Sequence, residues 1–500
     1  MEGGASVSHC AVFTLPPAAL CSFLGAMVAE ALVRRDLAHQ QGELAPTGDL
    51  AACSGYPLAG AAGSPVRSQP APDMARPFVQ NGDGQPKGLT HREQVYWMQQ
   101  ATHPLDYCNI KVDEDLLMAV QFELEHLPES IDHTRGEVLN FWRSRAAALA
   151  DAQTLWADEA PRPLRKLVSK LHGPLIQEMC DAMQYEDGDL VACLQEGFPY
   201  AGVLPAAGVA VRPDPPKPLG DLTIAELREQ RQALNKQVIS RLRPSEWDQD
   251  VLANTLEDVS FGAMAGPWPL ATIDTSRVSL SRRLPVREER DGEVRTRVVD
   301  DKTESAVNLA TQPAEKLSHD TIDVMIVILR LFLIADEAPL MWKRDIGKVF
   351  RCIAIEASHL DLSWVVFMAD GIRMAAQHLA LPFGTTSAVH SWHRTGAFLL
   401  AAVRRLCLAP AGRFVDDYFG ASKADVNITS GTCLDVIGEL VGFPCKPTKT
   451  VNAAIEMILL GAKIAMRLQT QQIIACVCPS KAARWTQVLL DIQRIGKCAP

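Results

Sequence analysis

The sequence lacks the cysteine spacing of a zinc-binding or disulfide-stapled protein. Its 13 cysteines are scattered, no CxxC pair occurs, and the closest two, Cys476 and Cys478, have neither a second pair nor a histidine nearby. Structural zinc sites combine closely spaced Cys and His ligands, and disulfide frameworks use an even number of cysteines. The cysteines therefore predict a reduced, intracellular protein, cytoplasmic or nuclear and not secreted.

The chain also lacks a clear membrane-spanning or secretory segment. A fairly apolar stretch, residues 11–33, contains two prolines and a glutamate, and no basic segment precedes it. A transmembrane helix needs about 20 mostly apolar residues in succession, and a signal peptide begins with positive charge. Residues 1–90, rich in Ala, Gly, Pro and Ser, predict instead a disordered or low-complexity leader, and we expect no membrane partner.

An excess of positive charge is absent as well, since the net charge is −10 and the pI is near 5.7. Many nucleic-acid-binding domains are basic, so this balance weighs against a surface that is basic throughout. A local basic groove is still enough to bind nucleic acid, and an acidic balance suits an enzyme that gathers carboxylates around metal ions. The length of 500 residues allows two or three domains.

Helical periodicity begins near residue 91 and continues to about residue 260. Apolar residues recur at helical spacing, for example at Leu116, Leu117, Val120 and Leu124. A proline-rich stretch near 205–220 predicts a linker inside this region. We expect a helical accessory region over 91–260, with helices over residues 113–125, 138–150, 164–183 and 222–243.

From about residue 270 the pattern alternates between strands and helices. We expect a strand running into Asp345, and strands or strand pairs over residues 277–286, 294–299, 364–369, 413–419, 455–466 and 472–477. We expect helices over residues 385–408, 428–441 and 484–495. Elements in this order predict an α+β fold, with an antiparallel sheet that carries helices on one face.

Two adjacent carboxylates, Asp416 and Asp417, lie where this pattern predicts the bend of a tight strand pair. Neighbouring carboxylates repel each other unless a cation neutralises them, and Mg²⁺ prefers carboxylate oxygens. The pair alone is ambiguous, because it also fits a solvated turn and a second such pair occurs at Asp300 and Asp301. A third acid, Asp345, ends an apolar strand upstream and favours a shared metal site.

Six motifs follow one another in order: RTRVVDD (295–301) with Asn308, DIGKVF (345–350), LPFG (381–384), FVDD (414–417), GFPCKPTK (442–449) and LLG (459–461). This ordered set resembles the fingers and palm of reverse transcriptases. LPFG, the SxxH of residues 387–390 and VDD together are most similar to the DIRS-type retrotransposon branch, which pairs a reverse transcriptase with a tyrosine recombinase; GAMAGP (262–267) is similar too. The resemblance implies polymerase right-hand fingers and palm over 270–470 and the start of a truncated thumb over 471–500.

The resemblance assigns catalysis and metal binding to Asp345, Asp416 and Asp417. Asp345 and Asp416 would be the essential pair that holds two Mg²⁺ (or Mn²⁺) ions, with Asp417 as an adjunct. Two ions about 3.5–4 Å apart can activate a primer 3′-hydroxyl and stabilise the leaving pyrophosphate. The implied partners are an RNA or DNA template with its primer, and dNTPs. The oligomeric state stays open.

Basic residues are assigned to the triphosphate. Arg295 and Arg297 would bind it, because guanidinium groups bind phosphate oxygens bidentately. They could instead pair with neighbouring glutamates in a solvated hairpin. Lys449 resembles the palm lysine proposed to protonate the leaving pyrophosphate, and Lys446 could take its place; either lysine also fits an ordinary surface position.

Three further positions are assigned to the rest of the nucleotide and its template. Phe350 would lie beneath the sugar and exclude a 2′-hydroxyl by shape, although a core phenylalanine fits the same pattern. Gly384 would let the backbone approach the template strand or base pair closely. Phe383 stands where many reverse transcriptases carry a polar residue, and is a recognised variant in the DIRS-like branch.

Two other functions share these motifs. An RNA-dependent RNA polymerase has the same palm and Asp-Asp hairpin, but it usually carries Gly before the pair and a polar sugar-sensing residue, so Val415 and Phe350 favour DNA synthesis. The second alternative is a truncated, inactive retroelement remnant that only binds nucleic acid, because no complete thumb follows. The intact Asp345, Asp416 and Asp417 favour an enzyme.

Overall fold

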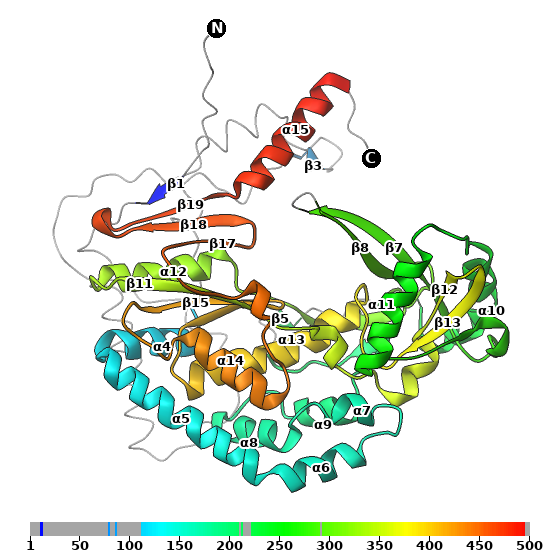
Figure 1. The fold of residues 1–500 in the computed structure, drawn as a ribbon, viewed down its shortest axis with the longest axis horizontal. Coiled ribbons are helices and arrows are strands. Elements are labelled where there is room, and N and C mark those ends of the chain that lie inside the picture. The colour runs from blue at the N-terminus through cyan, green and yellow to red at the C-terminus, as the bar shows by residue number, and fades with distance from the viewer. Residues whose placement is uncertain are drawn as a thin grey trace. The chain divides into compact units, whose positions relative to one another are not determined.

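The structure of the protein is a computed structural model that describes residues 112–209, 212–213, 222–290 and 293–495 (Figure 1). It also gives three short strands nearer the N-terminus, β1 (Ala11–Phe13), β2 (Val79–Gln80) and β3 (Pro86–Lys87). The chain divides into two units, Pro16–Lys111 and Met1–Leu15 with Val112–Pro500. In the first unit β2 pairs with β3, and the rest of the predicted leader lies outside the described residues. The second unit has an α+β fold.

Residues 112–261 are mainly helical, as the periodicity predicts. The helices are α4 (Glu114–Glu125), α5 (Pro128–Ala148), α6 (Ala150–Glu159), α7 (Arg165–Val168), α8 (Gly173–Met183), α9 (Leu190–Glu196), α10 (Ile224–Ser240) and α11 (Asp248–Phe261). The single helix expected over 164–183 is wrong: α7 ends and α8 begins anew, because Pro174 lacks the N–H that a continuous helix would use. His172 caps α8 by accepting the backbone N–H of Leu175 at 3.3 Å.

These helices have no separate core. Leu139 and Leu175 belong to the same cluster of buried side chains as Trp342 and Phe443 from the C-terminal half. α14 (Ser430–Val441) contacts both α5 and α8, which lie beneath it in Figure 1. The helical region is therefore packed into the same unit as the strands that follow it.

The proline-rich stretch near 205–220 is described only in part. Just before it, β4 (Gly202–Leu204) pairs in parallel with β9 (Thr311–Pro313). Within it, β5 (Arg212–Pro213) pairs with β10 (Glu315–Lys316). Both short pairings connect the region to residues 311–316.

A five-stranded sheet has the strand order β6-β13-β12-β7-β8. Its strands are β6 (Met264–Pro269), β7 (Leu280–Arg290), β8 (Glu293–Asp301), β12 (Trp364–Ala369) and β13 (Ile372–His378). The expected strand pair β7–β8 and the strand over 364–369 are confirmed. The expectation of an all-antiparallel sheet is wrong here, because β12 pairs with β7 in parallel, with Trp364 opposite Leu280.

Helices cover both faces of this sheet, not one face as expected. Val365 and Phe367 pack with Val251 of α11, whereas Val366 packs with Val238 of α10 on the other face. A strand buried on both faces has no polar side, which explains the unbroken apolar run WVVFMA.

A four-stranded antiparallel sheet, the carboxylate sheet, has the order β14-β15-β11-β16. Its strands are β11 (Pro339–Asp345), β14 (Ala411–Phe414), β15 (Asp417–Lys423) and β16 (Val451–Ala454). α12 (Ile322–Ile334) contacts β11 and β15, and α14 contacts both from below in Figure 1. α13 (Thr386–Ala401) passes beside β14 and ends in a π-helical turn, Ala402–Leu406, within the helix expected over 385–408.

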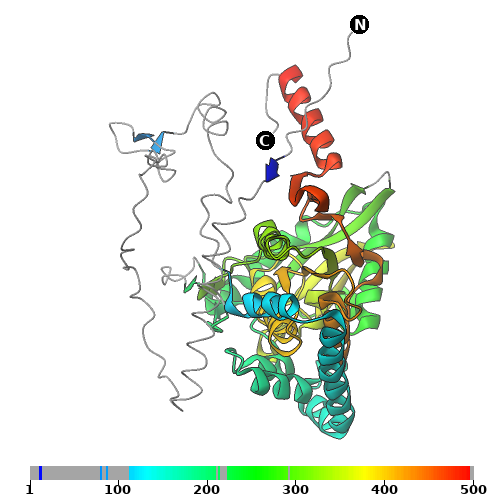
Figure 2. The ribbon, with the colours of Figure 1, turned by 90° about the vertical axis from the view of Figure 1, so that its left-hand side faces the viewer.

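The C-terminal sheet contains β17 (Glu456–Leu459), β18 (Ala462–Arg467) and β19 (Gln472–Val477), with β1 beside β19. The expected hairpin over 455–466 and strand over 472–477 are confirmed. α15 (Pro479–Ile495) follows and projects beyond these strands in both views (Figures 1 and 2), and its described side chains are exposed. Within the described part of the chain, no helix has the length and apolar character needed to cross a membrane.

Candidate active site

Two of the three predicted carboxylates face each other across β11 and β15. The register between these strands runs without a break from Pro339 opposite Lys423 to Asp345 opposite Asp417. Directly opposed residues of an antiparallel pair point to the same face of the sheet. Asp345 is 2% exposed, and the side chain of Asp417 is 23% exposed. Asp345 and Asp417 therefore meet at one end of the carboxylate sheet, on one face.

The alternation of side chains along the strands decides which face this is. Arg344 binds Asp435 of α14 with Nε–Oδ1 at 2.8 Å, and Tyr418 donates to the backbone oxygen of Gly396 in α13 at 2.9 Å. Asp345 and Asp417 are their immediate neighbours along the chain. The two carboxylates therefore point away from α13 and α14.

The third carboxylate, Asp416, lies in the turn between β14 and β15. Val415 has φ of +54°, a left-handed conformation that β-branched residues rarely adopt. Its carbonyl oxygen accepts hydrogen bonds from Trp392 Nε1 at 2.7 Å and from Arg413 Nη1 at 3.0 Å, which hold the strained turn. The backbone oxygen of Asp416 accepts the N–H of Ile346 at 3.1 Å. The turn is thus fixed against the end of β11, next to Asp345.

Lysines neutralise these acids. Lys446 and Lys449, at the 3₁₀ turn Pro447–Lys449, each donate to one oxygen of Asp345, at 2.7 and 2.6 Å. Lys343 forms an ion pair with Asp417 at 2.9 Å. Sequence reasoning placed Lys446 and Lys449 near the triphosphate and missed Lys343. Its position two residues before Asp345 on the same strand was the available signal, because strand residues i and i+2 share a face.

The pKa values of two carboxyls reflect this arrangement. Burial raises the pKa of Asp345, but the hydrogen bonds from Lys446 and Lys449 outweigh it, so the pKa lies below its usual value. The pKa of Asp416 is raised, first by burial and then by the negative charge of Asp345. The charges of Asp345 and Asp416 therefore repel each other across a short distance.

This donor set fits a hard divalent cation. All the candidate ligand atoms are carboxylate oxygens, the ligands that Mg²⁺ prefers, and added positive charge would relieve the repulsion at Asp416. Among the described residues, no three Asp, Glu, His or Cys side chains already converge on a common point. Both oxygens of Asp345 and Oδ1 of Asp417 bind lysine ammonium groups instead. Metal binding by Asp345, Asp416 and Asp417 stays a prediction.

Three residues predicted to bind the nucleotide come together in the structure. Phe350, in the 3₁₀ turn Val349–Cys352, meets the ring of Phe383 edge-on, with centroids 4.8 Å apart and an interplanar angle of 80°. The guanidinium of Arg297, on β8, lies over the Phe383 ring at 5.4 Å. Phe350 is 6% exposed, whereas Phe383 is 39% exposed. The stack therefore runs from a buried ring after Asp345 to an exposed cation.

Gly384 lies beside this stack in a loop that Asn308 holds. Asn308 Nδ2 donates to the backbone oxygen of Gly384 at 2.8 Å, and its Oδ1 accepts the N–H of Thr386 at 3.1 Å. Gly384 has φ of +93°, and a Cβ there would lie 3.4 Å from the backbone oxygen of Asp300, an ordinary contact. Glycine is thus favoured by the backbone angle and not by lack of space.

The structure gives different information on Arg295 and Lys449, the two other residues predicted to contact phosphate. The backbone of Arg295 lies on β8 opposite Glu288, but its side chain is outside the described residues. Lys449 reaches Asp345, so its ammonium belongs to the carboxylate site. Phosphate binding by either residue stays a prediction.

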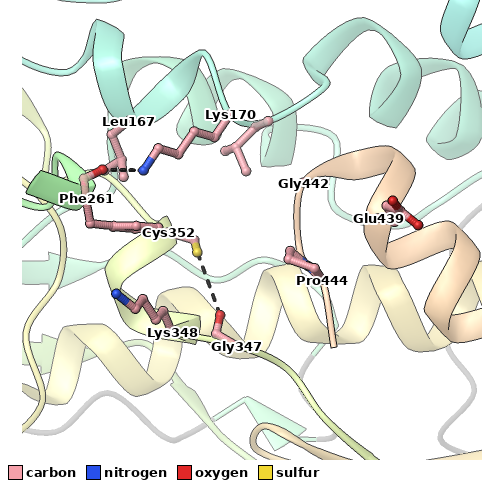
Figure 3. Close-up of a pocket in the computed structure, with 10 residues that line it drawn as sticks. Leu167, Lys170, Phe261, Gly347, Lys348, Cys352, Glu439, Gly442 and Pro444 are labelled. Carbon is pink, nitrogen blue, oxygen red and sulfur yellow. Dashed lines mark hydrogen bonds between the residues drawn. The ribbon is translucent and has the colours of Figure 1, made fainter. Parts of the chain in front are cut away.

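A cavity of about 440 Å³ lies between the α7–α8 connection, the end of α14 and residues Gly347 to Cys352 (Figure 3). Its two lysines have protein partners: Lys170 donates to the backbone oxygen of Phe261, and Lys348 pairs with Glu257 at 2.7 Å. Burial raises the pKa of Cys352 to about 11, which keeps this thiol protonated. The cavity therefore lies between the helical region and the segment that follows Asp345. Its two lysines, Lys170 and Lys348, bind the C-terminal part of α11.

Comparisons with known proteins give a limited result. No family model matches the chain, and no curated protein matches it. Among solved structures it is similar to the foamy viral protease-reverse transcriptase in complex with dsDNA, at 12% identity and a TM-score of 0.34, over 65% of this chain and 55% of that one. A second foamy viral complex with dsDNA, of the form designated dRH, gives 12% identity and a TM-score of 0.30, over 58% and 47%. The chain spans about half the length of these proteins, and TM-scores this low assign neither fold nor function.

Proposed function

We propose that this protein is a reverse transcriptase, an RNA-directed DNA polymerase of a retroelement most similar to the DIRS-type branch. The observation that carries the proposal is the position of Asp345 opposite Asp417, with Asp416 in a turn fixed against the end of the same strand. Gathering three carboxylates at one strand end is costly for packing alone, because the charges repel each other. The cost is offset where divalent cations are bound between the carboxylates.

The carboxylates would hold two Mg²⁺ or Mn²⁺ ions. When bound, such ions make a primer 3′-hydroxyl more nucleophilic and neutralise charge on the leaving pyrophosphate. Lys446 and Lys449 hold both oxygens of Asp345, so this carboxylate keeps one orientation before a substrate arrives. Because Lys449 already lies within the site, we assign to it the protonation of the leaving pyrophosphate.

The Phe350–Phe383–Arg297 stack would receive the incoming nucleotide. We assign Arg297 to the triphosphate, with its guanidinium oriented by the Phe383 ring. Arg295 lies two residues earlier on the same strand, and we assign it to the triphosphate as well. Phe350 would lie against the sugar. A ribose 2′-hydroxyl placed against this ring loses water without gaining a hydrogen bond, which favours dNTPs.

A primer-extension assay tests the proposal. The purified protein is incubated with Mg²⁺ or Mn²⁺, a primer on an RNA or a DNA template, and either one dNTP or the matching rNTP. We expect extension on the RNA template with a preference for dNTP of at least about tenfold, equivalent to roughly 1.4 kcal/mol. A preference for rNTP would establish the RNA-polymerase alternative instead. No extension under any condition would overturn the proposal.

A further inference from the structure

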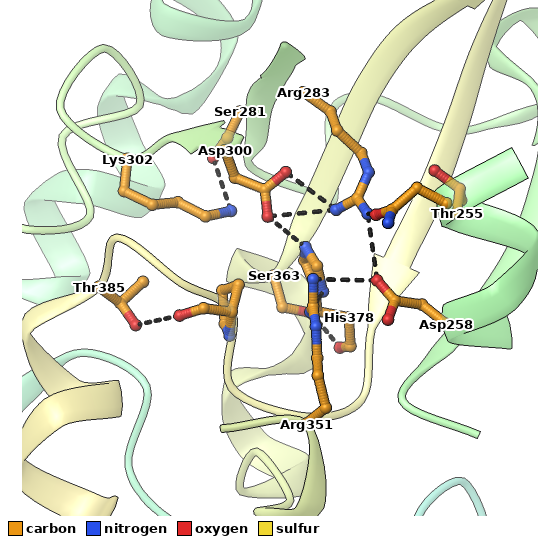
Figure 4. A network of polar contacts seen from close by, with 12 residues as sticks. Thr255, Asp258, Ser281, Arg283, Asp300, Lys302, Arg351, Ser363, His378 and Thr385 are labelled. Atoms are coloured by element: carbon orange, nitrogen blue, oxygen red, sulfur yellow. Dashed lines mark hydrogen bonds and ion pairs between the residues drawn. The ribbon is translucent and has the colours of Figure 1, made fainter. Parts of the chain in front are cut away.

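Five buried polar side chains from five different elements form a closed ring (Figure 4). They come from α11, β7, β8, β13 and the 3₁₀ turn that carries Phe350. The contacts run from Arg351 to Asp258 (3.0 Å), Asp258 to Arg283 (3.1 Å), Arg283 to Asp300 (3.1 Å), Asp300 to His378 (2.8 Å) and His378 back to Arg351 (2.8 Å). We call this set the five-residue ring. Its closure means that each member has a partner on both sides.

The geometry fixes the protonation of the ring. Arg351 can only donate, so Nδ1 of His378 must accept, and the proton of the neutral imidazole therefore lies on Nε2, which donates to Asp300. Burial lowers the pKa of His378 well below its usual value, in spite of the opposing charge of Asp300. With His378 neutral, two aspartates balance two arginines. Loss of any one member removes a hydrogen bond or ion pair from both of its neighbours in the ring.

The ring reaches the nucleotide stack from two sides. Arg351 directly follows Phe350 in the 3₁₀ turn. On the other side, Asp300 lies on β8, the strand that carries Arg297. The backbone oxygen of Asp300 lies next to Gly384. Phe350 and Arg297 are the two residues that contact Phe383 in the stack. The five-residue ring therefore holds Phe350 and the β8 strand that carries Arg297, the two partners of the Phe383 side chain, in fixed positions.

We infer that the five-residue ring positions Phe350 against the sugar of the incoming nucleotide, with Arg351 as the main positioning residue, and so sets the preference for deoxyribose. This inference rests on the proposed polymerase function. The ring members do not touch the substrate; they act through Phe350 and through the β8 strand. Displacing a substrate contact by about 1 Å can change a rate a hundredfold, so loss of the ring should be measurable.

The test compares dNTP and rNTP extension by the wild-type protein and by Arg351→Met, His378→Phe and His378→Gln. We expect Arg351→Met and His378→Phe to reduce the dNTP:rNTP ratio of kcat/KM by about tenfold, mainly through a higher kcat/KM for rNTP, because a displaced Phe350 no longer excludes the 2′-hydroxyl. His378→Gln should keep most of the ratio, because its amide can accept from Arg351 and donate to Asp300. If Arg351→Met fails to fold, the two His378 variants still test the inference. His378→Phe removes the contacts to Arg351 and Asp300, whereas His378→Gln can keep both.

Arg231→Met is the matched control. Arg231 is also a buried arginine in the same part of the chain, and it pairs with Asp361, which keeps Arg228 as a second partner. We expect this variant to lose stability but to keep the wild-type ratio. An unchanged ratio in both Arg351→Met and His378→Phe, with an active wild type, would overturn the positioning inference alone. A wild-type protein that extends no primer would overturn the proposed function itself.

Discussion

Asp345 is buried, yet both of its oxygens bind lysines and a second carboxylate lies opposite it. Burying a charge is costly unless partners compensate, and the two lysines provide that compensation. The excess of charged groups at this strand end, both acidic and basic, is what a site for phosphates and divalent cations requires.

Phe350 gives the first prediction at the scale of single residues. Phe350→Ala should lower the dNTP:rNTP preference by at least about tenfold, because the ring that would exclude the 2′-hydroxyl is gone; the underlying penalty is roughly 1–3 kcal/mol. Single-nucleotide extension with each nucleotide measures this. Phe332→Ala, which removes a fully buried ring in α12, is the control and should keep the preference. Equal preference in wild type and Phe350→Ala would identify Phe350 as core packing only.

Lys302 gives a second prediction, on stability. It is fully buried beside the five-residue ring and donates to Ser281 at 3.2 Å. Burial, only partly opposed by Asp300, lowers its pKa from 10.5 to about 8. Between pH 8 and 10.5 the unfolded chain therefore binds more protons at this position, and stability should rise with pH by up to about 1.4 kcal/mol per pH unit. Below pH 8 the cost of the buried charge is fully present.

Lys302→Met should consequently be more stable than wild type at pH 7, and its advantage should shrink by pH 9. Urea unfolding at the two pH values measures the difference. Lys236→Met, which changes an exposed lysine on α10, is the control and should follow the wild-type pH dependence. If Lys302→Met is instead less stable than wild type, and by the same amount at pH 7 and pH 9, the prediction is wrong. That result would show that the buried ammonium group stabilises the fold.

The sequence predicted site residues that the structure brings together, but not the residues that hold them in place. Asp345, Phe350, Phe383 and Arg297 lie in ordered motifs, so their type and spacing were informative. The five-residue ring draws one residue from each of five elements, so no spacing along the chain reveals it. Asp300 even stood in the sequence as a second Asp-Asp pair that could be a solvated turn, whereas the structure buries it.

At the scale of elements, the glycines that follow α14 and α11 have nearly the same backbone conformation but different surroundings. Gly442 follows α14 with φ of +94°, and Gly262 follows α11 with φ of +92°. Both positions favour glycine, and alanine in this conformation costs about 1–2 kcal/mol. A Cβ at Gly442 would lie 2.3 Å from the backbone oxygen of Lys170, whereas at Gly262 the nearest atoms, at 3.2 Å, belong to the flexible side chain of Lys166.

Gly442→Ala should therefore lower the free energy of unfolding by about 1–3 kcal/mol more than Gly262→Ala, because a backbone carbonyl must move. Chemical denaturation of both variants measures this. Because the backbone cost of alanine is the same at both sites, the difference between the two variants reports how closely the α7–α8 connection packs against the end of α14. Equal losses would mean that these segments are not in close contact.

Local patterns predicted most elements and the pairing of strands joined by a turn, but not the pairing of strands far apart in the sequence. Turn residues and alternation placed β7–β8, β12 and the β17–β18 hairpin, and helical spacing placed α4, α10 and α14. The parallel pairing of β12 with β7 joins segments about 80 residues apart, and local patterns carry no information on such a contact. The run WVVFMA is typical of a strand buried on both faces, but it does not say which elements cover those faces.

At the scale of the whole molecule, the helices of residues 112–196 and the strands of the site share one core. The sequence predicted a helical accessory region because composition and periodicity change near residue 270. Periodicity shows that a helix has an apolar face, but not which surface covers it. In the structure that surface includes α14, on the face of the carboxylate sheet opposite to Asp345. The helical region thus supports the strand that carries the site.

Replacement of Asp345 by asparagine is the most direct measurement of the proposed chemistry. Asparagine keeps the shape of the side chain but removes the charge that would hold a cation, so primer extension should fall at least a thousandfold while folding and template binding persist. Asp361→Asn is the control, because Asp361 is likewise a carboxylate paired with two cations, Arg228 and Arg231, but lies in the 3₁₀ segment Ala357–Leu362 and not on the carboxylate sheet. Its extension rate should stay within about tenfold of wild type. Extension by Asp345→Asn at the wild-type rate would contradict the assignment of the catalytic carboxylates.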